Sequence, residues 1–488
     1  MTVRLSENTL SRLPADVARP AYDRNDLSAG IFHFGVGNFH RAHLATYLDE
    51  MMNRGRALDW GIVGGGVRPE ERAGRAVLAD QEWLSTLVEQ SATVSRARVI
   101  GSMVDFVTPG EASAIIERLS RPDIRIVSLT ITEGGYFLDA DDRFDASHPD
   151  LLADAELPAS PRTVFGLILA ALRLRRDAGT APFTVMSCDN IPHNGDVTRG
   201  TLTGLAGLQD PAFAEWVAEN VAFPNGMVDR ITPATTDRER RLLADGFGVE
   251  DGWPVFCEDF RQWVLEDRFP LGRPPLEQVG VQFVEDVSPY ETMKLRILNA
   301  GHATIAYPAS LLGIEYVHEA MADERICAFL KRLEQTEIIP RVPPVPGIDL
   351  DAYFTEIRRR FANPKIGDTI RRLCLDGSNR QPKFIVPIIR DAIADGGSLQ
   401  GLALESALWC RYCAGKTDAG VPITPNDPHW ETLRPMAVAA RTDPARWLAQ
   451  TSIYGGAGAD ARFAEAFAGW LDQLWRRGTA ATLEAYLQ

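Results

Sequence analysis

The first 290 residues alternate short apolar runs with helical patterns, and this alternation leaves few folds open. Strands are expected, with helical segments between them, at residues 30–34, 60–63, 125–131 and 183–188. Strands that alternate with helices form a parallel, doubly wound sheet with helices on both faces. After about residue 290 strand-like runs largely vanish. We therefore expect an α/β domain over residues 1–285 and a mostly α-helical domain over residues 286–488.

The composition argues against several classes of protein. With 45% hydrophobic and 24% charged residues, the 488-residue chain is long enough for two or more domains with real cores. A net charge of −15 argues against nucleic-acid binding, which needs a basic face. No apolar run approaches the ~20 residues that span a bilayer, and the N-terminus lacks the pattern of a secretory signal. We expect a cytoplasmic protein, a monomer or weak homo-oligomer, that binds neither nucleic acid nor membrane.

The cysteines and histidines form no metal-binding pattern in the sequence. The six cysteines are dispersed, which suits a reducing compartment. Cys410 and Cys413 form a single CxxC in a helical segment, and without a second pair or a nearby histidine two core thiols are the favoured interpretation. There is also no HExxH motif. We expect no metal site, so an alcohol oxidation by this chain would need a protein base.

A turn with two glycines follows the first expected strand and opens a helix. It reads Gly35-Val-Gly-Asn-Phe-His-Arg41. In this context glycines let the backbone approach a pyrophosphate at a helix N-terminus. The third glycine of the usual fingerprint is absent, and Arg41 stands near its place and could contact phosphate itself. The candidate dinucleotide-binding residues of this turn are Gly35, Val36, Gly37, Asn38, Phe39 and Arg41.

Two glutamates follow the second expected strand. Glu70 and Glu71 stand where an NAD enzyme holds the hydroxyls of the adenosine ribose, at the tip of strand two. Glu70 lies 35 residues beyond Gly35, farther than the usual ~20, so this interpretation needs a longer first crossover. An exposed acidic turn is the alternative, and the sequence leaves both open.

Two polar segments offer further ligand-binding groups. Asn190 follows the fourth expected strand at its C-terminal end, where ligand sites of α/β sheets gather. Its amide could hold an alkoxide without a change of charge, although a turn chosen for conformational reasons explains the segment equally. Asp229 lies in a polar loop with a similar ambiguity, and by itself it fits a cap better than a ligand.

Lys294 is the first lysine in the chain, and it lies in a largely apolar stretch between Tyr290 and His302. A genome that favours arginine codons explains why lysine is scarce. However, a lysine amine can lose its proton when it is buried or near another cation, whereas a guanidinium cannot. A proton acceptor is therefore a good reason to keep a lysine here, and we predict that Lys294 is a general base.

A regular helix would place several functional groups on one side of this stretch. At 100° per residue, Glu291, Lys294 and His302 fall within an arc of about 80°, and Asn299 lies about 60° farther round. A solvated polar stripe is the alternative, but the neighbouring side chains are Met, Leu and Ile. The segment is thus expected to present an acid, an amine, an amide and an imidazole to a ligand.

Two arginines, Arg372 and Arg380, flank the turn Asp376-Gly-Ser-Asn379. Such a turn could aim both guanidinium groups at substrate hydroxyls.

Together these segments resemble the polyol-specific long-chain dehydrogenases, most closely the mannitol-oxidising members, over nearly the whole chain. The resemblance rests on the motifs Gly35-Val-Gly-Asn-Phe-His-Arg-Ala-His43, Thr130-Ile-Thr-Glu-Gly-Gly-Tyr136, Ser187-Cys-Asp-Asn190, Asp229-Arg-Ile-Thr-Pro233 and Lys294…Asn299…His302. It implies an expanded Rossmann-type parallel sheet, a mostly α-helical C-terminal domain, NAD as cofactor and a small-molecule polyol or ketose as substrate. The implied reaction is the metal-independent oxidation of a polyol to a ketose. D-mannitol to D-fructose is expected first, with D-arabinitol or D-sorbitol as further substrates.

The resemblance also implies roles for single residues. Lys294 would be the general base, with Glu291 relaying its protons to solvent. The alkoxide or carbonyl oxygen would be held by Asn190 and Asn299. Substrate hydroxyls would be bound by Asp229, His302, Arg372 and Arg380. Cofactor contacts would come from the turn that starts at Gly35, from Glu133, and from Glu70 or Glu71.

Two departures from the family pattern touch the substrate side. Arg380 stands where close relatives have a lysine, and Ala-Gly-His302 replaces Gly-Ser-His. A hexuronate reductase, acting on fructuronate or tagaturonate, is the nearest alternative, because Arg380 could pair with a carboxylate. A non-catalytic NAD-dependent sugar sensor is the alternative from another class. The intact lysine, asparagine and histidine set, and the lack of a DNA-binding or partner module, count against it.

Overall fold

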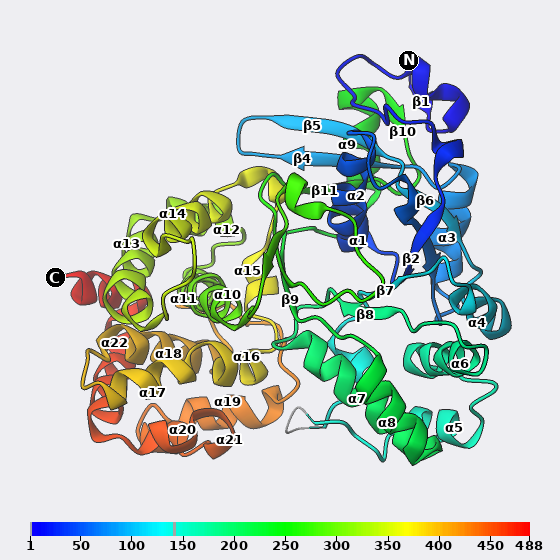
Figure 1. Ribbon diagram of the computed structural model, residues 1–488. Helices are drawn as coiled ribbons and strands as arrows, with labels where there is room; N and C mark the ends of the chain where they lie inside the picture. The colour runs from blue at the N-terminus through cyan, green and yellow to red at the C-terminus, as the bar shows by residue number, and fades with distance from the viewer. Residues whose placement is uncertain (1, 140–142) are drawn as a thin grey trace. The chain divides into compact units, whose positions relative to one another are not determined.

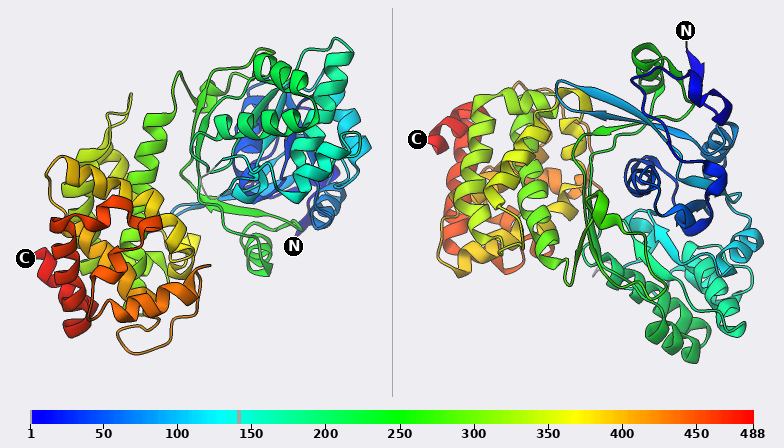
Figure 2. Two further views of the ribbon diagram at one scale, coloured as in Figure 1. Left: turned by 90° about the horizontal axis from the view of Figure 1, so that it is seen from below. Right: turned by 45° about the horizontal axis from the view of Figure 1, so that its top comes forward.

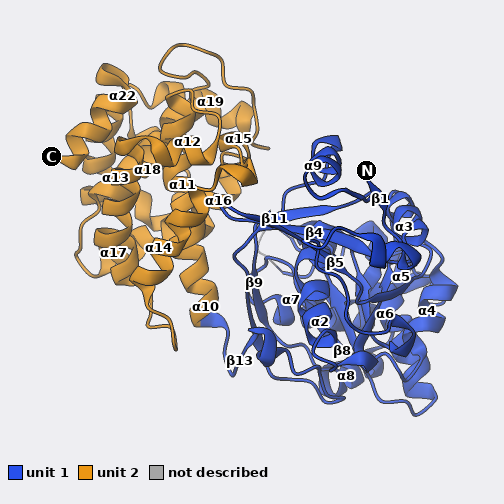
Figure 3. Cartoon of the chain, turned by 90° about the horizontal axis from the view of Figure 1, so that it is seen from above, with its two compact units in different colours: residues 1–288 blue, residues 289–488 orange. Residues whose placement is uncertain are grey.

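A computed structural model describes residues 2–139 and 143–488 of the chain (Figures 1 and 2). The chain divides into two compact units, Met1–Ser288 and Pro289–Gln488 (Figure 3). Within the described ranges, no helix is both long and apolar enough to cross a membrane. The functional roles expected for the two domains, divided after residue 285, stay predictions at this level.

The first unit is built on a parallel sheet of five strands (Figure 1). From one edge to the other, the strands are β6 (Met103–Phe106), β3 (Gly61–Gly65), β2 (Ala29–Phe34), β7 (Ile126–Leu129) and β8 (Thr184–Ser187). Counted along the chain, this is the order 3-2-1-4-5 of a Rossmann sheet. The order reverses between β2 and β7, so the switch point at which such sheets bind ligands lies at the C-terminal ends of these two strands.

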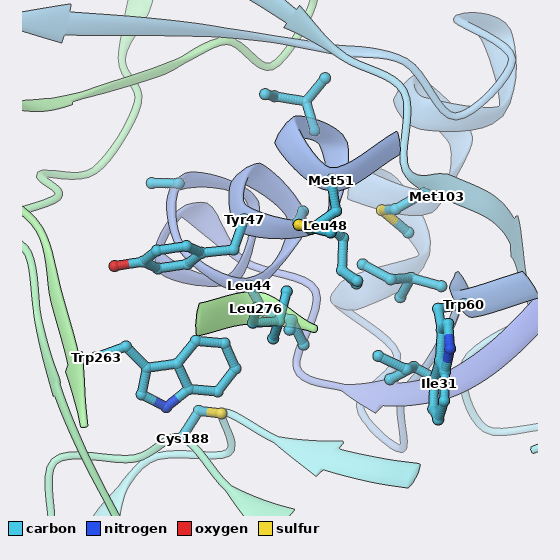
Figure 4. Close-up of a cluster of buried hydrophobic side chains, with 14 of the residues drawn as sticks. Ile31, Leu44, Tyr47, Leu48, Met51, Trp60, Met103, Cys188, Trp263 and Leu276 are labelled. Carbon is cyan, nitrogen blue, oxygen red and sulfur yellow. The ribbon is translucent and has the colours of Figure 1, made fainter. Parts of the chain in front are cut away.

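Both faces of the parallel sheet are buried, because neighbouring strand residues point into opposite cores. Ile31 of β2 belongs to one cluster, and Phe32 and Phe34 belong to the other. Figure 4 shows the first cluster, in which Leu44, Leu48 and Met51 of helix α2 (Leu44–Met52) lie among Ile31, Trp60 and Met103. The opposite cluster takes in the helices α4 (Ala112–Ser120) and α6 (Val164–Asp177).

Further elements enlarge this unit beyond the five-stranded sheet. The additional strands form three small sheets, made of β11 (Val255–Glu258), β4 (Ser85–Gln90) and β5 (Ser95–Ile100), of β13 (Gln282–Val284), β12 (Gln262–Glu266) and β9 (Gly226–Asp229), and of β1 (Val3–Arg4) and β10 (Val249–Glu250). The other helices are α1 (Asn38–Ala42), α3 (Glu71–Asp80), α5 (Pro149–Glu156), α7 (Asn194–Gln209), α8 (Pro211–Asn220) and α9 (Asp237–Phe247). The expected expanded Rossmann-type sheet is therefore present.

The regular elements of the second unit are helices, apart from two isolated bridges, and Figure 2 shows them from two directions. They are α10 (Ser288–Met293), α11 (Ala300–Leu311), α12 (Val317–Ala322), α13 (Glu324–Leu333), α14 (Leu350–Phe361), α15 (Ile370–Leu373), α16 (Gly377–Phe384), α17 (Val386–Ala394), α18 (Gln400–Cys413), α19 (Trp430–Ala439), α20 (Ala445–Leu448), α21 (Thr451–Tyr454) and α22 (Ala461–Leu487). Two π-helical segments, Lys294–Asn299 and Glu334–Ile338, interrupt the α-helical geometry.

Helix α18 lies at the centre of the second unit and is buried almost along its whole length. It packs against α22, and its thiols Cys410 and Cys413 are buried within it. It also carries Glu405, which is fully buried and accepts a hydrogen bond of 2.6 Å from the Nε2 of Gln381. Burial raises the pKa of Glu405 to about 8, because the charged carboxylate is poorly solvated there.

The raised pKa of Glu405 predicts a loss of stability as pH rises. The unfolded chain releases this proton near the ordinary value of 4.5 and the folded chain near 8, so stability falls between these values, by up to about 1.4 kcal/mol per pH unit. Glu405→Gln keeps an acceptor for Gln381 and removes the titration. Urea unfolding from pH 5 to 8.5 should therefore show a flatter profile for this variant, whereas the exposed change Glu431→Gln should retain the wild-type slope. Parallel profiles for Glu405→Gln and the wild type would contradict the prediction.

Candidate functional site

The turn at the C-terminal end of β2 contains two glycines, and the structure explains them differently. Gly35 has a φ of +90°, and a Cβ there would lie 2.0 Å from the carbonyl oxygen of Thr130. The fold itself therefore excludes a side chain at Gly35. A Cβ at Gly37 would lie 3.7 Å from its nearest neighbour, the oxygen of Gly35. Protein packing therefore does not require a glycine at position 37. A ligand that binds closely to the backbone of this turn would require one.

The polar side chains that follow in this turn form hydrogen bonds to other protein groups. Asn38 donates from Nδ2 to the carbonyl oxygen of Pro233, at 2.8 Å, and accepts a 2.8 Å bond from Arg41. Arg41 is buried, also donates to the carbonyl oxygen of Trp253 and lies over that indole ring. Burial lowers the pKa of Arg41 to about 10.

The two apolar side chains of the turn are also turned toward protein. Val36 is buried in the core, and Phe39 is partly buried and stacks on His43. The part of this turn that can face a ligand is therefore chiefly its backbone. The cofactor role of each of these side chains stays a prediction.

The loop after β3 carries the two predicted ribose ligands. Glu71, the first residue of α3, accepts a 2.9 Å bond from the backbone N–H of Arg68, and burial raises the pKa of its carboxyl. Glu70 is exposed. The crossover from β2 to β3 contains α1, α2 and a 3₁₀ turn, Leu58–Trp60, which accounts for the long spacing from the glycine turn. Glu70 is thus the more available carboxylate of the two.

A buried carboxylate that was not predicted, Asp189, braces the loop after β7. Its oxygens accept hydrogen bonds from the N–H groups of Ile131 and Thr132, both at 2.9 Å, and from the hydroxyl of Tyr136 at 2.7 Å. Glu133 lies exposed in this braced loop. Burial raises the pKa of Asp189. The motif Ser187-Cys-Asp-Asn190 contained the signal, but sequence reasoning gave a role only to its last residue.

Asn190 and Asp229 lie on segments that another asparagine, Asn194, joins. Asn190 is exposed after β8, and Asp229 is the buried last residue of β9. Asn194 donates to the carbonyl oxygens of Asp189 and Gly226, at 3.1 and 2.8 Å, and accepts from the N–H of Gly226 at 2.9 Å. These bonds fix the loop that carries Asn190 to the start of the strand that ends at Asp229.

In the second unit, the prediction of a regular α-helix around Lys294 is wrong for the segment Lys294–Asn299. This segment is π-helical and continues α10 into α11. Hydrogen bonds from i to i+5 widen the turn, so residues five apart move toward the same side and the angular offset computed for Asn299 no longer holds. Lys294 and Glu291 are each 7% exposed, and Asn299 is half-buried. Single π-helical turns within α-helices are frequent at functional sites.

His302 follows on the same helix, and its ring stacks on Phe361 at a centroid distance of 4.2 Å. Burial holds the pKa of His302 well below its usual value, and the nearby charges of Arg372, Arg360 and Arg380 lower it further. The imidazole is therefore neutral. Its buried Nε2 has no hydrogen-bond partner in the part of the chain that the structure describes. Arg360 was not predicted as part of this group.

The turn between the two predicted arginines is tightly held. Arg372 makes a paired contact with the carboxylate of Asp368, and Arg380 donates from Nη1 to the carbonyl oxygen of Leu373 at 3.1 Å. A Cβ at Gly377 would lie 2.6 Å from the indole nitrogen of Trp409, so only glycine fits there. The second unit thus brings His302, Arg372 and Arg380 together.

Each unit offers a distinct set of groups. The first presents a glycine turn at the switch point of a parallel sheet and carboxylates after the neighbouring strands β3 and β7, which suits a dinucleotide. The second presents a buried amine, an acid, an amide and a neutral imidazole. Among the described residues, no group of three or more His, Cys, Asp or Glu side chains lies placed to hold a metal ion.

The strand order and glycine turn define the first unit as a Rossmann-type dinucleotide-binding fold. The chain matches the mannitol dehydrogenase Rossmann domain over residues 29–278 and the mannitol dehydrogenase C-terminal domain over residues 286–475. The chain therefore belongs to the mannitol dehydrogenase family.

Relatives of known name match over nearly their whole length. Mannitol 2-dehydrogenase of Cereibacter sphaeroides is 57% identical over 473 residues, which are 96% of this chain and 99% of the relative. The structure of Pseudomonas fluorescens mannitol 2-dehydrogenase, a ternary complex with NAD and D-mannitol, is 45% identical and covers 99% of each chain at a TM-score of 0.89. A substrate-free D-sorbitol dehydrogenase structure is 36% identical and has a TM-score of 0.91, with 98% of this chain and 100% of that chain covered.

The two glycines of the turn should respond differently to alanine. Gly35→Ala should lower the free energy of unfolding by more than about 1 kcal/mol, because of its positive φ and the blocked space at Thr130. Gly37→Ala should unfold like the wild type but bind NADH more weakly, because its methyl group occupies open space in front of the turn. Denaturant unfolding and fluorescence titration with NADH measure the two effects. Wild-type NADH binding by Gly37→Ala would show that ligands do not approach there.

Proposed function

We propose that this NAD-dependent polyol dehydrogenase catalyses the metal-independent oxidation of D-mannitol to D-fructose, with D-arabinitol and D-sorbitol as further substrates. The observation that carries the mechanism is the π-helical segment Lys294–Asn299, which begins with a buried lysine and ends with an asparagine. A buried lysine loses its proton more readily than a lysine that is hydrated at the surface, so this position suits proton transfer.

We assign the role of general base to Lys294. Its neutral amine takes the proton of the reacting hydroxyl, and in the reverse direction its ammonium returns a proton to the carbonyl oxygen. Glu291, one α-helical turn earlier and equally buried, passes the proton on to solvent. NAD, when bound, accepts the hydride that leaves C2. One hydroxyl and one C–H bond are thus converted into a carbonyl, NADH and a proton.

The developing negative charge on the reacting oxygen needs donors that do not themselves ionise. We assign this role to the side-chain amides of Asn299 and Asn190, since aligned donors stabilise an oxyanion without a metal. The other substrate hydroxyls are assigned to Asp229, His302, Arg372 and Arg380. The neutral state of His302 supports its part, because a neutral imidazole can either donate or accept a hydrogen bond.

The cofactor contacts are assigned to the first unit. The backbone of the turn from Gly35 to Gly37 is proposed to bind the pyrophosphate, and Glu70 or Glu71 the adenosine ribose, with Glu70 favoured by its exposure. A carboxylate there accepts bonds from the ribose hydroxyls and repels the 2′-phosphate of NADP. Glu133 is assigned a cofactor contact from its exposed place in the loop after β7. Arg41 contributes by holding the turn, given its buried contacts with Asn38 and Trp253.

A second candidate function is the reduction of a hexuronate. Arg372, Arg360 and Arg380 all act on His302, and the contact of Arg380 with a carbonyl oxygen does not cancel its charge. A positive group of this kind would favour a substrate with a carboxylate. We rank this function second, because the relatives described above are mannitol and sorbitol dehydrogenases.

Absorbance at 340 nm with a panel of substrates tests the proposed function. We expect turnover of D-mannitol with NAD, weaker turnover of D-arabinitol and D-sorbitol, and a preference for NAD over NADP. Dialysis against EDTA should leave the rate unchanged. A kcat/KM for fructuronate far above that for fructose would favour the hexuronate reductase, and absence of turnover would favour a sugar sensor. Lost activity that Zn²⁺ restores would overturn the metal-independent mechanism.

The role of Lys294 predicts that charge alone cannot replace it. Lys294→Ala should lower kcat by about 10²–10⁴-fold, the usual contribution of general-base catalysis. Lys294→Arg should be equally inactive, because a guanidinium keeps the charge and does not release its proton. NADH titration should show that both variants still bind the cofactor. Lys331→Arg, the same change at an exposed position, is the matched control with wild-type kcat. Appreciable turnover by Lys294→Arg would refute the assignment.

A further inference from the structure

A chain of three side chains, of which Thr130 is half-buried and the other two are buried, ends on the carbonyl oxygen of the glycine turn. Thr130, directly after β7, donates from Oγ1 to the carbonyl oxygen of Gly35 at 2.8 Å. The same oxygen of Thr130 lies 3.0 Å from Nε2 of His33, which also lies 3.3 Å from the carbonyl oxygen of Gly35. Nδ1 of His33 lies 2.8 Å from Oγ of Ser128. His33 and Ser128 are fully buried. None of the cofactor-binding or catalytic roles described above uses these three residues.

The direction of every proton in this chain follows from chemistry. The single hydroxyl proton of Thr130 goes to the carbonyl oxygen of Gly35, so Thr130 can only accept from His33. Nε2 of His33 must therefore carry a proton. Burial lowers the pKa of His33 to about 3, which leaves Nδ1 unprotonated. Nδ1 then accepts the hydroxyl proton of Ser128. The chain runs in one direction, from Ser128 through His33 to Thr130 and Gly35, and the Nε2 proton of His33 is shared between the Thr130 hydroxyl and the Gly35 carbonyl oxygen.

The position of the His33 ring is fixed by a second imidazole. The rings of His33 and His40 are stacked, with centroids 3.6 Å apart and an interplanar angle of 17°. His40 belongs to α1, which starts directly after the glycine turn. Burial also holds the pKa of His40 well below its usual value, so two neutral rings can stack without charge repulsion. The chain therefore connects β2, β7 and the first helix.

This arrangement controls the direction of one backbone N–H group. In a trans peptide the C=O of one residue and the N–H of the next point in opposite directions. Because Thr130 and His33 hold the carbonyl oxygen of Gly35 on the protein side, the N–H of Val36 points away from them. Outward N–H groups in such a turn are what a pyrophosphate binds.

We propose that Ser128, His33 and Thr130 are positioning residues that aim the Val36 N–H at the pyrophosphate of the dinucleotide. This inference rests on the proposed binding of NAD at the turn. The three residues touch neither cofactor nor substrate, and they act through the peptide between Gly35 and Val36. Their loss is expected to weaken the binding of ligands that contain a pyrophosphate, while other binding steps are left intact.

The experiment compares dinucleotide fragments in variants of Thr130. Thr130→Val keeps the shape of the side chain but removes the hydroxyl, and Thr130→Ser keeps the hydroxyl. NADH fluorescence titration should give a Kd raised roughly three- to tenfold in Thr130→Val, the worth of one hydrogen bond, and near wild type in Thr130→Ser. ADP-ribose, as a competitor, should lose the same factor, whereas adenosine, which lacks the pyrophosphate, should not. At saturating NAD, the KM for polyol should stay unchanged.

Two further variants separate positioning from general damage to the fold. Thr201→Val removes another buried hydroxyl that donates to a backbone carbonyl, that of Tyr136, and should leave NADH binding unchanged. Ser128→Ala acts at the far end of the chain, because it frees His33 to move its proton to Nδ1. Ser128→Ala should raise the Kd for NADH, but by a smaller factor than Thr130→Val. This variant therefore tests the inference even if Thr130→Val does not fold.

The outcomes also distinguish this inference from the proposed function. A wild-type chain that binds no NADH would overturn both. Wild-type binding with an unchanged Kd in Thr130→Val and Ser128→Ala would overturn the positioning role alone. Equal losses for ADP-ribose and adenosine, or a Thr130→Ser variant as weak as Thr130→Val, would also overturn it, because the effect would then not act through the pyrophosphate.

Discussion

The alternation of side chains along β2 is the constraint on which the first unit depends. This strand is hydrogen-bonded to β3 on one side and β7 on the other, and it sends Ile31 into one core and Phe32 and Phe34 into the other. A slip of one residue would exchange the two faces. Because the register is fixed, the ends of β2 and β7 coincide, and Thr130 meets the carbonyl oxygen of Gly35. The candidate cofactor site is therefore a consequence of how the sheet is packed.

The alternation of strands and helices, visible in the sequence, predicted this sheet but not all of its strands. The four expected strands correspond to β2, β3, β7 and β8. The fifth, β6, was missed because Met103-Val-Asp-Phe106 is short and contains an acid. The small sheets around β4 and β12 were missed too, since their strands mix polar and apolar residues. β4 forms a hairpin with β5, but it also pairs with the distant β11, and β12 pairs with β9. A strand that is buried on both faces of its sheet is a continuous apolar run and is easy to recognise in the sequence. A strand that is buried on one face only gives a weaker sequence pattern.

For the candidate site as well, the sequence indicated which residue types could act but not the contacts that they make. Residue type and position in a motif led to the predictions for Lys294, His302 and the turn at Gly35, because few residue types could perform the roles proposed for them. Sequence could not show that Arg41 is buried against Trp253, since this depends on residues about two hundred positions apart. It also could not show that Asp189, rather than its neighbour Asn190, accepts three hydrogen bonds inside the fold. Such contacts exist only after tertiary packing.

The π-helical segment is the feature that a helical periodicity could least predict. Its wider turn is less favourable than an α-helix, which is why such segments are rare. Lys294–Asn299 packs against the second π-helical segment, Glu334–Ile338. Glu334 is fully buried, and burial raises the pKa of its carboxyl well above the usual value.

The carboxyl of Glu334 lies against the helix that carries Lys294. A Cβ at Gly301 would lie 3.2 Å from Oε1 of Glu334, so a larger residue at Gly301 would have to displace this carboxyl. The space left by the missing side chain thus lets the two π-helical segments approach each other. Since a displaced Glu334 would disturb the packing of both segments, we expect the π-helical geometry that begins at Lys294 to depend on a glycine and a neutral acid that have no proposed chemical role.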